Sequence, residues 1–116
     1  MNAGGRNITV FNSHPSPGPG KEEERRREYE RLTELFDGEE TFVAFGDYNA
    51  RSMDEFEPFV KAGYSMANTG IVTEEKGNLT DNIIVSKNIR ITSVKTFDKE
   101  FVLSDHAILW AELEIL

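Results

Sequence analysis

The chain has 116 residues and a formal net charge of −8, with 13 lysines and arginines against 21 aspartates and glutamates. This length fits one domain with a single modest core, and no apolar stretch approaches the roughly 20 residues of a membrane-spanning helix. The acidic balance works against non-specific affinity for nucleic acids and anionic membranes. The absence of cysteine excludes disulfides, thiolate metal sites and cysteine nucleophiles.

Residues 7–12 are predicted to form the first long strand, because apolar and β-branched residues dominate them. The first residues contain no apolar segment of signal-peptide length, so a cytoplasmic location is the default expectation. The segment 15–20 holds three of the four prolines and cannot continue a strand or helix. His14 therefore lies at a junction between strand and loop, where a histidine is more often an ordinary surface residue than a catalytic one.

A helix is predicted over residues 21–36, which are strong helix formers. Gly38 is expected to take a left-handed conformation just after it. The only dense basic run, Arg25-Arg26-Arg27, follows three glutamates and is interpreted as a solvated helix face with i,i+3 and i,i+4 ion pairs. The core-facing side of the helix is predicted to carry an apolar stripe, formed by Tyr29, Leu32, Leu35 and Phe36.

The apolar run 42–45 is typical of a strand buried on both faces. It ends at Gly46 and is followed by Asp47 and Asn49. Ligands of open α/β sheets gather at the carboxyl ends of strands, which favours a binding or catalytic site at this point. An Asx turn or a helix cap explains the same residues without any chemistry.

A short helix is predicted next, opened by Ser52 and Glu55 as a capping box and closed by Gly63. Residues 64–78 are interpreted as a loop with one short strand at most, of the kind that carries substrate specificity beside a site.

The segments 82–86 and 89–94 are predicted to be adjacent strands joined by a short turn. Asp81 directly precedes the first of them. The terminal segment 107–115 is a further predicted strand, and it follows Asp105 and His106.

Polar residues thus recur where strands begin or end, and side chains of this kind that converge bind a hard cation and a phosphate and supply general acid and base chemistry. They occur in four short motifs: Asn12-Ser13-His14, Gly46-Asp47-Tyr48-Asn49-Ala50, Asp81-Asn82-Ile83-Ile84-Val85-Ser86 and Ser104-Asp105-His106.

These four motifs, in this order, resemble those of the endonuclease/exonuclease/phosphatase superfamily of metal-dependent phosphoesterases. The resemblance covers residues 7 to 115. It implies one domain over residues 1–116 that is the C-terminal half of the family's fold. That half is one side of a four-layer α/β sandwich, with a mainly antiparallel or mixed sheet of about five or six strands and helices on one face.

The resemblance also implies a role for each residue of the site. Asp47 would orient or deprotonate the attacking water, and Asn49 would hydrogen-bond a phosphate oxygen. His14 would contact the phosphate from the opposite side. His106 would act as a second imidazole at the scissile phosphate, either as general base or as a charged clamp, and Asp81 would orient it. Asp105 would approach the metal or its waters.

The chain departs from the family in two positions, where Pro15 follows His14 and Asn82 stands in place of an aromatic residue or histidine. The larger departure is that the glutamate that is the family's principal magnesium ligand has no counterpart here. The chain is therefore interpreted as a fragment, as a half that dimerises, or as a half without activity. An uncovered sheet would expose an apolar face, so a homodimer or a complementary N-terminal half is expected as partner.

The function that follows from the resemblance is hydrolysis of a phosphate ester or phosphodiester, dependent on Mg²⁺ or Mn²⁺. The acidic charge favours a small molecule or a lipid head group over a nucleic acid as substrate. The alternative is a non-catalytic α/β half-domain that self-associates or binds a partner.

Overall fold

The centre of the structure is a four-stranded sheet in the order β3-β4-β6-β5, in a computed structural model that describes residues 2–116. Its parallel pair is β3 (Thr9–Ser13) and β4 (Phe42–Asp47). Antiparallel to β4 runs β6 (Asp81–Val85), and antiparallel to β6 runs the short β5 (Ser65–Met66). The sheet is mixed, and the predicted strands at 7–12 and 82–86 are confirmed to within two residues.

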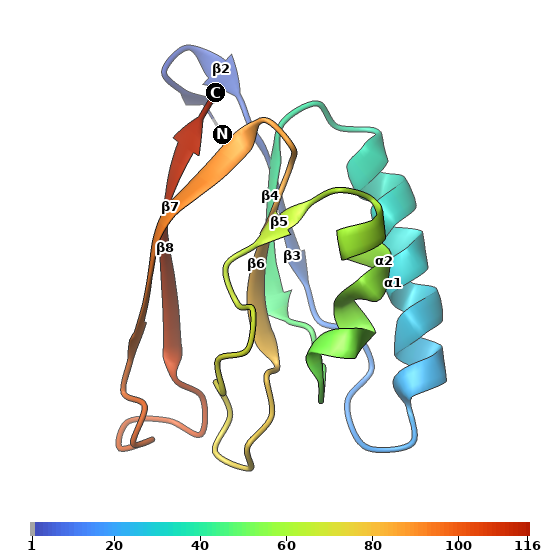
Figure 1. Cartoon of the computed structure of the whole chain (residues 1–116), viewed down its shortest axis with the longest axis vertical. Helices are drawn as coiled ribbons and strands as arrows, with labels where there is room; N and C mark the ends of the chain where they lie inside the picture. Colours follow the sequence, from blue (N-terminus) through green and yellow to red (C-terminus); the bar gives the residue numbers. More distant parts are fainter. Residues whose placement is uncertain (1) are drawn as a thin grey trace.

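Three helical segments cover one face of this sheet (Figure 1): α1 (Glu22–Asp37), the 3₁₀ turn η1 (Met53–Phe56) and α2 (Glu57–Lys61). Every second side chain of the central strands points toward the helices and forms an aromatic core with them. The core consists of Tyr29, Phe36, Phe42, Ala44, Tyr48, Ala50, Phe56, Phe59, Tyr64 and Ile84. The predicted α/β class with helices on one face is confirmed.

A separate two-stranded antiparallel ribbon lies on the opposite side of the sheet (Figure 1) and is formed by β7 (Ile89–Phe97) and β8 (Ile108–Ile115). The prediction that residues 82–86 and 89–94 are adjacent strands is wrong. Strand β6 already pairs with β4 on one side and β5 on the other, so it has no free edge for β7. The chain therefore crosses from one layer to the other after residue 86.

The ribbon covers only part of the sheet face that it opposes. Its strands contact β5 and β6, while Val10 of β3 and Phe45 of β4 remain 42% and 40% exposed. A small hairpin of β1 (Asn2–Ala3) and β2 (Arg6–Asn7) pairs next to the far end of the ribbon (Figure 1). The layer on this side is thus narrower than the sheet beneath it.

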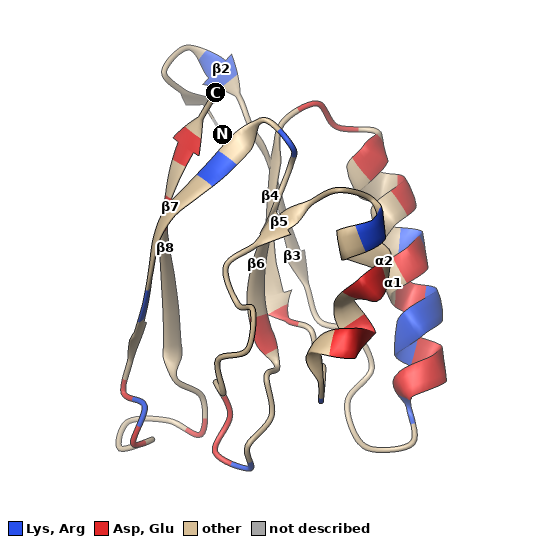
Figure 2. Cartoon of the chain, in the orientation of Figure 1, with Lys and Arg blue, Asp and Glu red and all other residues tan. Residues whose placement is uncertain are grey.

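Charged side chains gather mainly on the helical layer. Figure 2 shows acidic and basic residues interleaved along α1, and acidic residues at the adjoining ends of β4 and β6. The predicted i,i+3 and i,i+4 pairs are present, among them the pair of Arg27 with Glu23. Within residues 2–116, no helix has both the length and the apolar character needed to cross a bilayer.

Arg25 departs from the predicted solvated face, because its side chain is fully buried. Its Nε lies 2.6 Å from Glu55 Oε1. Its Nη1 donates to the carbonyl oxygens of Ser16 and Gly18, at 3.2 and 2.8 Å. A buried guanidinium needs such partners for its donors, and Arg25 thereby joins α1 to the proline-rich loop and to η1.

Two local predictions about helix ends are wrong, because other hydrogen bonds form at these positions. Gly38 has a right-handed backbone (φ −77°), because the last turn of α1 closes with a bond from its N–H to the Leu35 carbonyl and needs no left-handed residue. The capping box does not form at Ser52, which makes no capping bond. The Glu55 carboxylate instead accepts from Arg25 and from the Arg51 N–H.

Gly46 permits the close approach of β3 and β4 just before the polar turn. It has φ +152°, and a Cβ added to it would lie 2.0 Å from the Ser13 carbonyl oxygen. Both the backbone conformation and the missing side chain are therefore required here.

Replacing Gly46 with alanine is expected to lower the free energy of unfolding by about 3 kcal/mol, through steric overlap added to backbone strain. Gly70→Ala is the matched control, because Gly70 also has a positive φ (+143°) but nothing within 4 Å of an added Cβ. Urea denaturation should show the larger loss for Gly46→Ala. Equal losses would contradict the steric argument.

Arg25→Met is expected to cost about 3 kcal/mol of folding free energy, because it leaves the Glu55 carboxylate, whose side chain is only 11% exposed, without its charged partner. Arg26→Met is the control: Arg26 pairs with Glu57 at 3.6 Å with both side chains about half exposed, so its loss should stay below about 1 kcal/mol. Thermal and urea unfolding measure both. Similar losses of unfolding free energy in the two variants would show that the buried contacts of Arg25 do not stabilise the fold more than an exposed ion pair does.

Candidate active site

Asp47 and Asp81 occupy directly opposed positions in the antiparallel register of β4 and β6. Successive side chains in a strand alternate between faces. Asp47 and Asp81 therefore lie on the face opposite the aromatic core, together with Phe45 and Ile83, which are two residues away from them and also paired with each other. Two carboxylates opposite one another repel each other. Their proximity therefore calls for a compensating positive group.

His106 supplies that group from the segment that leads into β8. Its Nδ1 lies 2.7 Å from Asp81 Oδ2, and its Nε2 lies 3.7 Å from Asp47 Oδ2. Backbone pairing fixes this segment: the N–H of Ala107 donates to the Thr73 carbonyl at 2.7 Å, and His106 forms a β-bridge with Glu74. The imidazole thus lies between the two carboxylates.

Asp47, Asp81 and the neutral form of His106 also have the spacing of a metal site, since one ligand atom from each lies within 4.8 Å of the others. Asp105, the residue expected at the metal, is exposed and lies outside this group. Its carbonyl accepts the N–H of Glu75 at 2.9 Å, and its carboxylate accepts from the Ser104 hydroxyl at 3.4 Å. Its backbone therefore helps to place the neighbouring His106.

His14 and Asn49 reach Asp47 from the β3 side. His14 Nε2 lies 3.8 Å from Asp47 Oδ2, with the imidazole 71% exposed. The Asn49 backbone N–H donates to Asp47 Oδ1 at 2.9 Å, and its side-chain amide donates to the Pro15 carbonyl at 2.6 Å. The Asx turn that the sequence allowed is thus present, and it orients the same carboxylate that faces the two histidines.

The charges of the group shift two pKa values. Burial is the largest effect on the Asp47 carboxyl and raises its pKa. The hydrogen bond from the Asn49 N–H lowers this pKa and the charge of Asp81 raises it, so the net shift is upward. Burial alone would lower the pKa of His106, but the hydrogen bond and charge of Asp81 outweigh it, and the pKa lies above its ordinary value. His106 is therefore biased toward the imidazolium form.

Two buried amides, Asn82 and the previously unrecognised Asn68, support the acidic end of β6. The Asn68 N–H donates to Asn82 Oδ1 at 2.8 Å, while the Asn82 amide donates back to the Asn68 carbonyl at 3.1 Å. The Asn68 amide also donates to the Asp81 carbonyl at 3.0 Å, and the Asp81 N–H donates to Thr73 Oγ1 at 3.1 Å. No periodicity marks Asn68 or Thr73, which lie in the segment interpreted as a loop.

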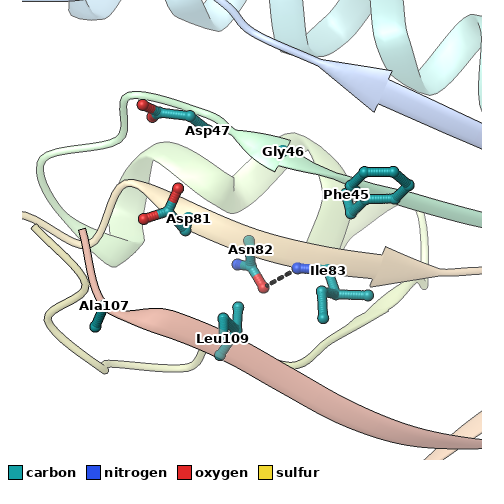
Figure 3. Close-up of a pocket in the computed structure, with 8 residues that line it drawn as sticks. All are labelled: Phe45, Gly46, Asp47, Asp81, Asn82, Ile83, Ala107 and Leu109. Atoms are coloured by element: carbon teal, nitrogen blue, oxygen red, sulfur yellow. Dashed lines mark hydrogen bonds between the residues drawn. The ribbon is translucent and has the colours of Figure 1, made fainter. Parts of the chain in front are cut away.

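An open pocket of about 410 Å³ joins the acidic pair to an apolar wall. Figure 3 shows Asp47 and Asp81 at one end and Phe45, Ile83 and Leu109 along its length. The wall comes from both layers, since β4 and β6 supply one side and β8 the other. The arrangement offers two carboxylates and an imidazole at the end of an apolar groove.

Comparison with solved structures identifies the fold. The human Nocturnin catalytic domain with bound sulfate anion matches with a TM-score of 0.72 and 16% identity, over 97% of this chain and 49% of that chain. An endonuclease/exonuclease/phosphatase family protein from Leptotrichia buccalis gives 0.73 and 15%, over 99% and 52%. An endonuclease/exonuclease/phosphatase from Bacteroides vulgatus gives 0.63 and 23%, over 82% and 45%.

The chain therefore has the fold of the C-terminal half of these longer proteins, as its motifs predicted, and it spans about half of their length. Neither the family models nor the curated sequences compared with the chain give a match.

Asp47→Asn is expected to raise the melting temperature at pH 7 in the presence of EDTA. The pKa of Asp47 is higher in the folded state than its unfolded value of 3.8. The protonated carboxyl group therefore stabilises the fold below pH 3.8, and this contribution is lost as the pH rises through the folded-state pKa. The ionised carboxylate thus destabilises the fold at neutral pH, and the amide does not ionise. The gain should shrink as pH falls toward 3.8.

Calorimetry at several pH values measures this difference, with the exposed Asp54→Asn as control. A lower melting temperature for Asp47→Asn at pH 7 would contradict the burial argument.

Proposed function

We propose that this chain carries the C-terminal part of the active site of a metal-dependent phosphoesterase, which hydrolyses a phosphate ester or phosphodiester with water. The observation that supports this most strongly is that His106 lies between two carboxylates. Its Nε2 is 3.7 Å from Asp47 Oδ2, and its Nδ1 is 2.7 Å from Asp81 Oδ2. A carboxylate that orients a histidine beside a second carboxylate is the arrangement that general acid and base chemistry requires.

Asp47 is the residue proposed to position the attacking water. Its raised pKa brings its basicity closer to that needed to accept a proton near neutral pH. The Asn49 N–H holds Oδ1, so Oδ2, which faces both histidines, is the oxygen that turns toward a water molecule. As the oxygen of that water attacks phosphorus, one of its protons passes to this carboxylate. The P–O bond to the alcohol breaks, and the departing alcohol oxygen takes up a proton from solvent water.

The imidazoles are proposed to hold the phosphate. Asp81 favours the protonated form of His106, and an imidazolium at the reaction centre stabilises the negative charge that develops on the phosphate oxygens. His14 lies on the other side of Asp47 Oδ2 and offers a second contact. An amide group carries two donor hydrogens, so Asn49 can donate to a phosphate oxygen while it keeps its bond to Pro15.

The donor set fits a hard divalent cation such as Mg²⁺ or Mn²⁺ in part. Magnesium is usually held by one or two carboxylates with water and substrate phosphate filling the other positions, and Asp47 and Asp81 offer two carboxylates within one small volume. When bound there, such an ion would neutralise charge on the phosphoryl group. Asp105 is proposed to act through the ion's water shell, since its carboxylate lies outside the group.

A further β-layer segment is proposed to complete the site. The ribbon leaves Val10 and Phe45 partly exposed, and the chain spans about half the length of the similar structures. Strands added beside β8 would cover this face and bring further acidic ligands to the metal. A complementary N-terminal half fits this requirement, and a second copy of the chain is the other source of such a layer.

The substrate is proposed to be a small phosphoester or a lipid head group. A net charge of −8 disfavours a polyanionic nucleic acid, and the pocket wall next to the acidic pair is apolar. One of the similar structures binds a sulfate anion, which has the shape and charge of a phosphate group.

Manganese binding tests the proposal without requiring turnover. Calorimetric titration of the chain with Mn²⁺ should show binding that Asp81→Ala and Asp47→Ala weaken at least about tenfold, the usual scale for loss of a ligand or of its orienting partner. Asp54→Ala is the control, because Asp54 is exposed on η1. Hydrolysis of bis(p-nitrophenyl) phosphate with Mg²⁺, Mn²⁺ or EDTA should follow the same order.

Sedimentation velocity on the same samples reports whether the chain self-associates. Equal metal affinity in wild type, Asp47→Ala and Asp81→Ala would contradict the proposed metal site. Hydrolysis that survives Asp47→Ala would contradict the role of this carboxylate. Metal-free, inactive protein in every oligomeric state would favour the non-catalytic half-domain.

A further inference from the structure

The loop between β7 and β8 presents two adjacent apolar side chains to solvent beside the proposed site. Val102 and Leu103 are 77% and 82% exposed, the highest values among the exposed large hydrophobic residues of the described chain. Isolated exposed apolar residues are common on soluble proteins. Two neighbours that project almost fully, three or four residues before His106, require another explanation.

The loop is a braced turn. The Asp98 carboxylate accepts the N–H of Val102 at 2.9 Å and that of Leu103 at 2.8 Å, one with each oxygen. The N–H of Phe101 donates to the Asp98 carbonyl at 2.9 Å. Asp98 and Phe101 both have left-handed backbones, with φ of 60° and 57°. Non-glycine residues take this conformation at a cost in free energy, so the turn is held in a defined shape that points the apolar pair outward.

The tip also lies at the correct end of the molecule. Figure 1 shows the β7–β8 loop at the same lower end of the molecule as the end of β4 and the start of β6, where Asp47 and Asp81 lie. Leu103 and His106 are three residues apart, which limits their Cα separation to about 11 Å. Interfacial segments bury apolar side chains about 5–10 Å into the boundary between lipid head groups and acyl chains. Insertion of Leu103 would therefore keep His106 within about 11 Å of a residue at that boundary, where the lipid phosphate groups lie.

The charges near the tip identify the kind of surface. Asp98 uses both carboxylate oxygens within the turn, and Lys99 is followed by Glu100, so the tip has no excess of positive charge. A chain of net charge −8 is repelled by anionic membranes. Aliphatic side chains on a tip without excess positive charge suit a zwitterionic lipid surface.

We propose that residues 98–103 insert Val102 and Leu103 into a zwitterionic lipid surface and so present lipid phosphate groups to Asp47, Asp81 and His106. The docking step stands on the exposed tip itself; only the fate of the lipid phosphate rests on the proposed phosphoesterase function. The proposal narrows the substrate class from phosphoesters in general to amphiphilic ones at an interface.

Co-sedimentation with phosphatidylcholine vesicles in EDTA tests the docking step without catalysis. The chain should bind, and Val102→Ser/Leu103→Ser should bind at least about tenfold more weakly, because burial of a single leucine side chain changes an equilibrium constant by roughly that factor. Leu35→Ser/Val60→Ser is the matched control, since these residues are 52% and 60% exposed on the helical layer. The prediction that Leu35 faces the core is therefore wrong. The control variant should bind like wild type.

Asp98→Ala provides a second variant that keeps both apolar side chains but removes their bracing, and it should also weaken binding. Replacement of part of the phosphatidylcholine by phosphatidylserine should not strengthen binding. The proposal is overturned if wild type does not bind phosphatidylcholine vesicles, if the double tip variant binds like wild type, or if binding requires the anionic lipid.

The two proposals can fail separately. A chain that binds vesicles through its tip but hydrolyses no phosphoester contradicts the proposed function alone. A chain that hydrolyses bis(p-nitrophenyl) phosphate while the tip variant and wild type bind vesicles equally contradicts the docking step alone.

Discussion

The opposition of Asp47 and Asp81 across β4 and β6 is the constraint on which the rest of the site depends. Two carboxylates in register repel each other, and neither is withdrawn into solvent, because the side chains of Asp47 and Asp81 are only 24% and 20% exposed. His106 relieves the repulsion by lying between them. Backbone pairing of His106 and Ala107 with Glu74 and Thr73 holds the segment before β8 in place, and so keeps the imidazole between the two carboxylates.

The helical layer fixes the register that creates this opposition. Phe42 and Ala44 pack into the aromatic core on one face of β4, as Ile84 does on β6. Because strand side chains alternate strictly, a shift by one residue would expose this core. The apolar requirement on one face therefore sends Asp47 and Asp81 to the other. Gly46 lets β3 run close beside β4, which brings His14 near Asp47 and the Pro15 carbonyl near the Asn49 amide.

The two faces of the sheet have different roles. The helical face is closed by stacked and edge-on aromatic rings and by the buried Arg25–Glu55 pair, which also holds the proline-rich loop beside Asn49. The ribbon face is open, with an apolar groove that ends at the carboxylates. Stability is concentrated behind the site, and the exposed apolar surface lies where substrate or additional strands must enter.

The sequence alone determined the element types, most of their bounds and the residues at the strand ends, because hydrophobic periodicity and turn residues are local signals. The tertiary structure decided what no local signal encodes. Periodicity shows which face of a strand is buried but not which strand it pairs with, so β7 was assigned to β6 although that strand's edges were taken. Likewise, charge spacing on a helix could not reveal that Arg25 is buried, since its partners Glu55, Ser16 and Gly18 meet it only through folding.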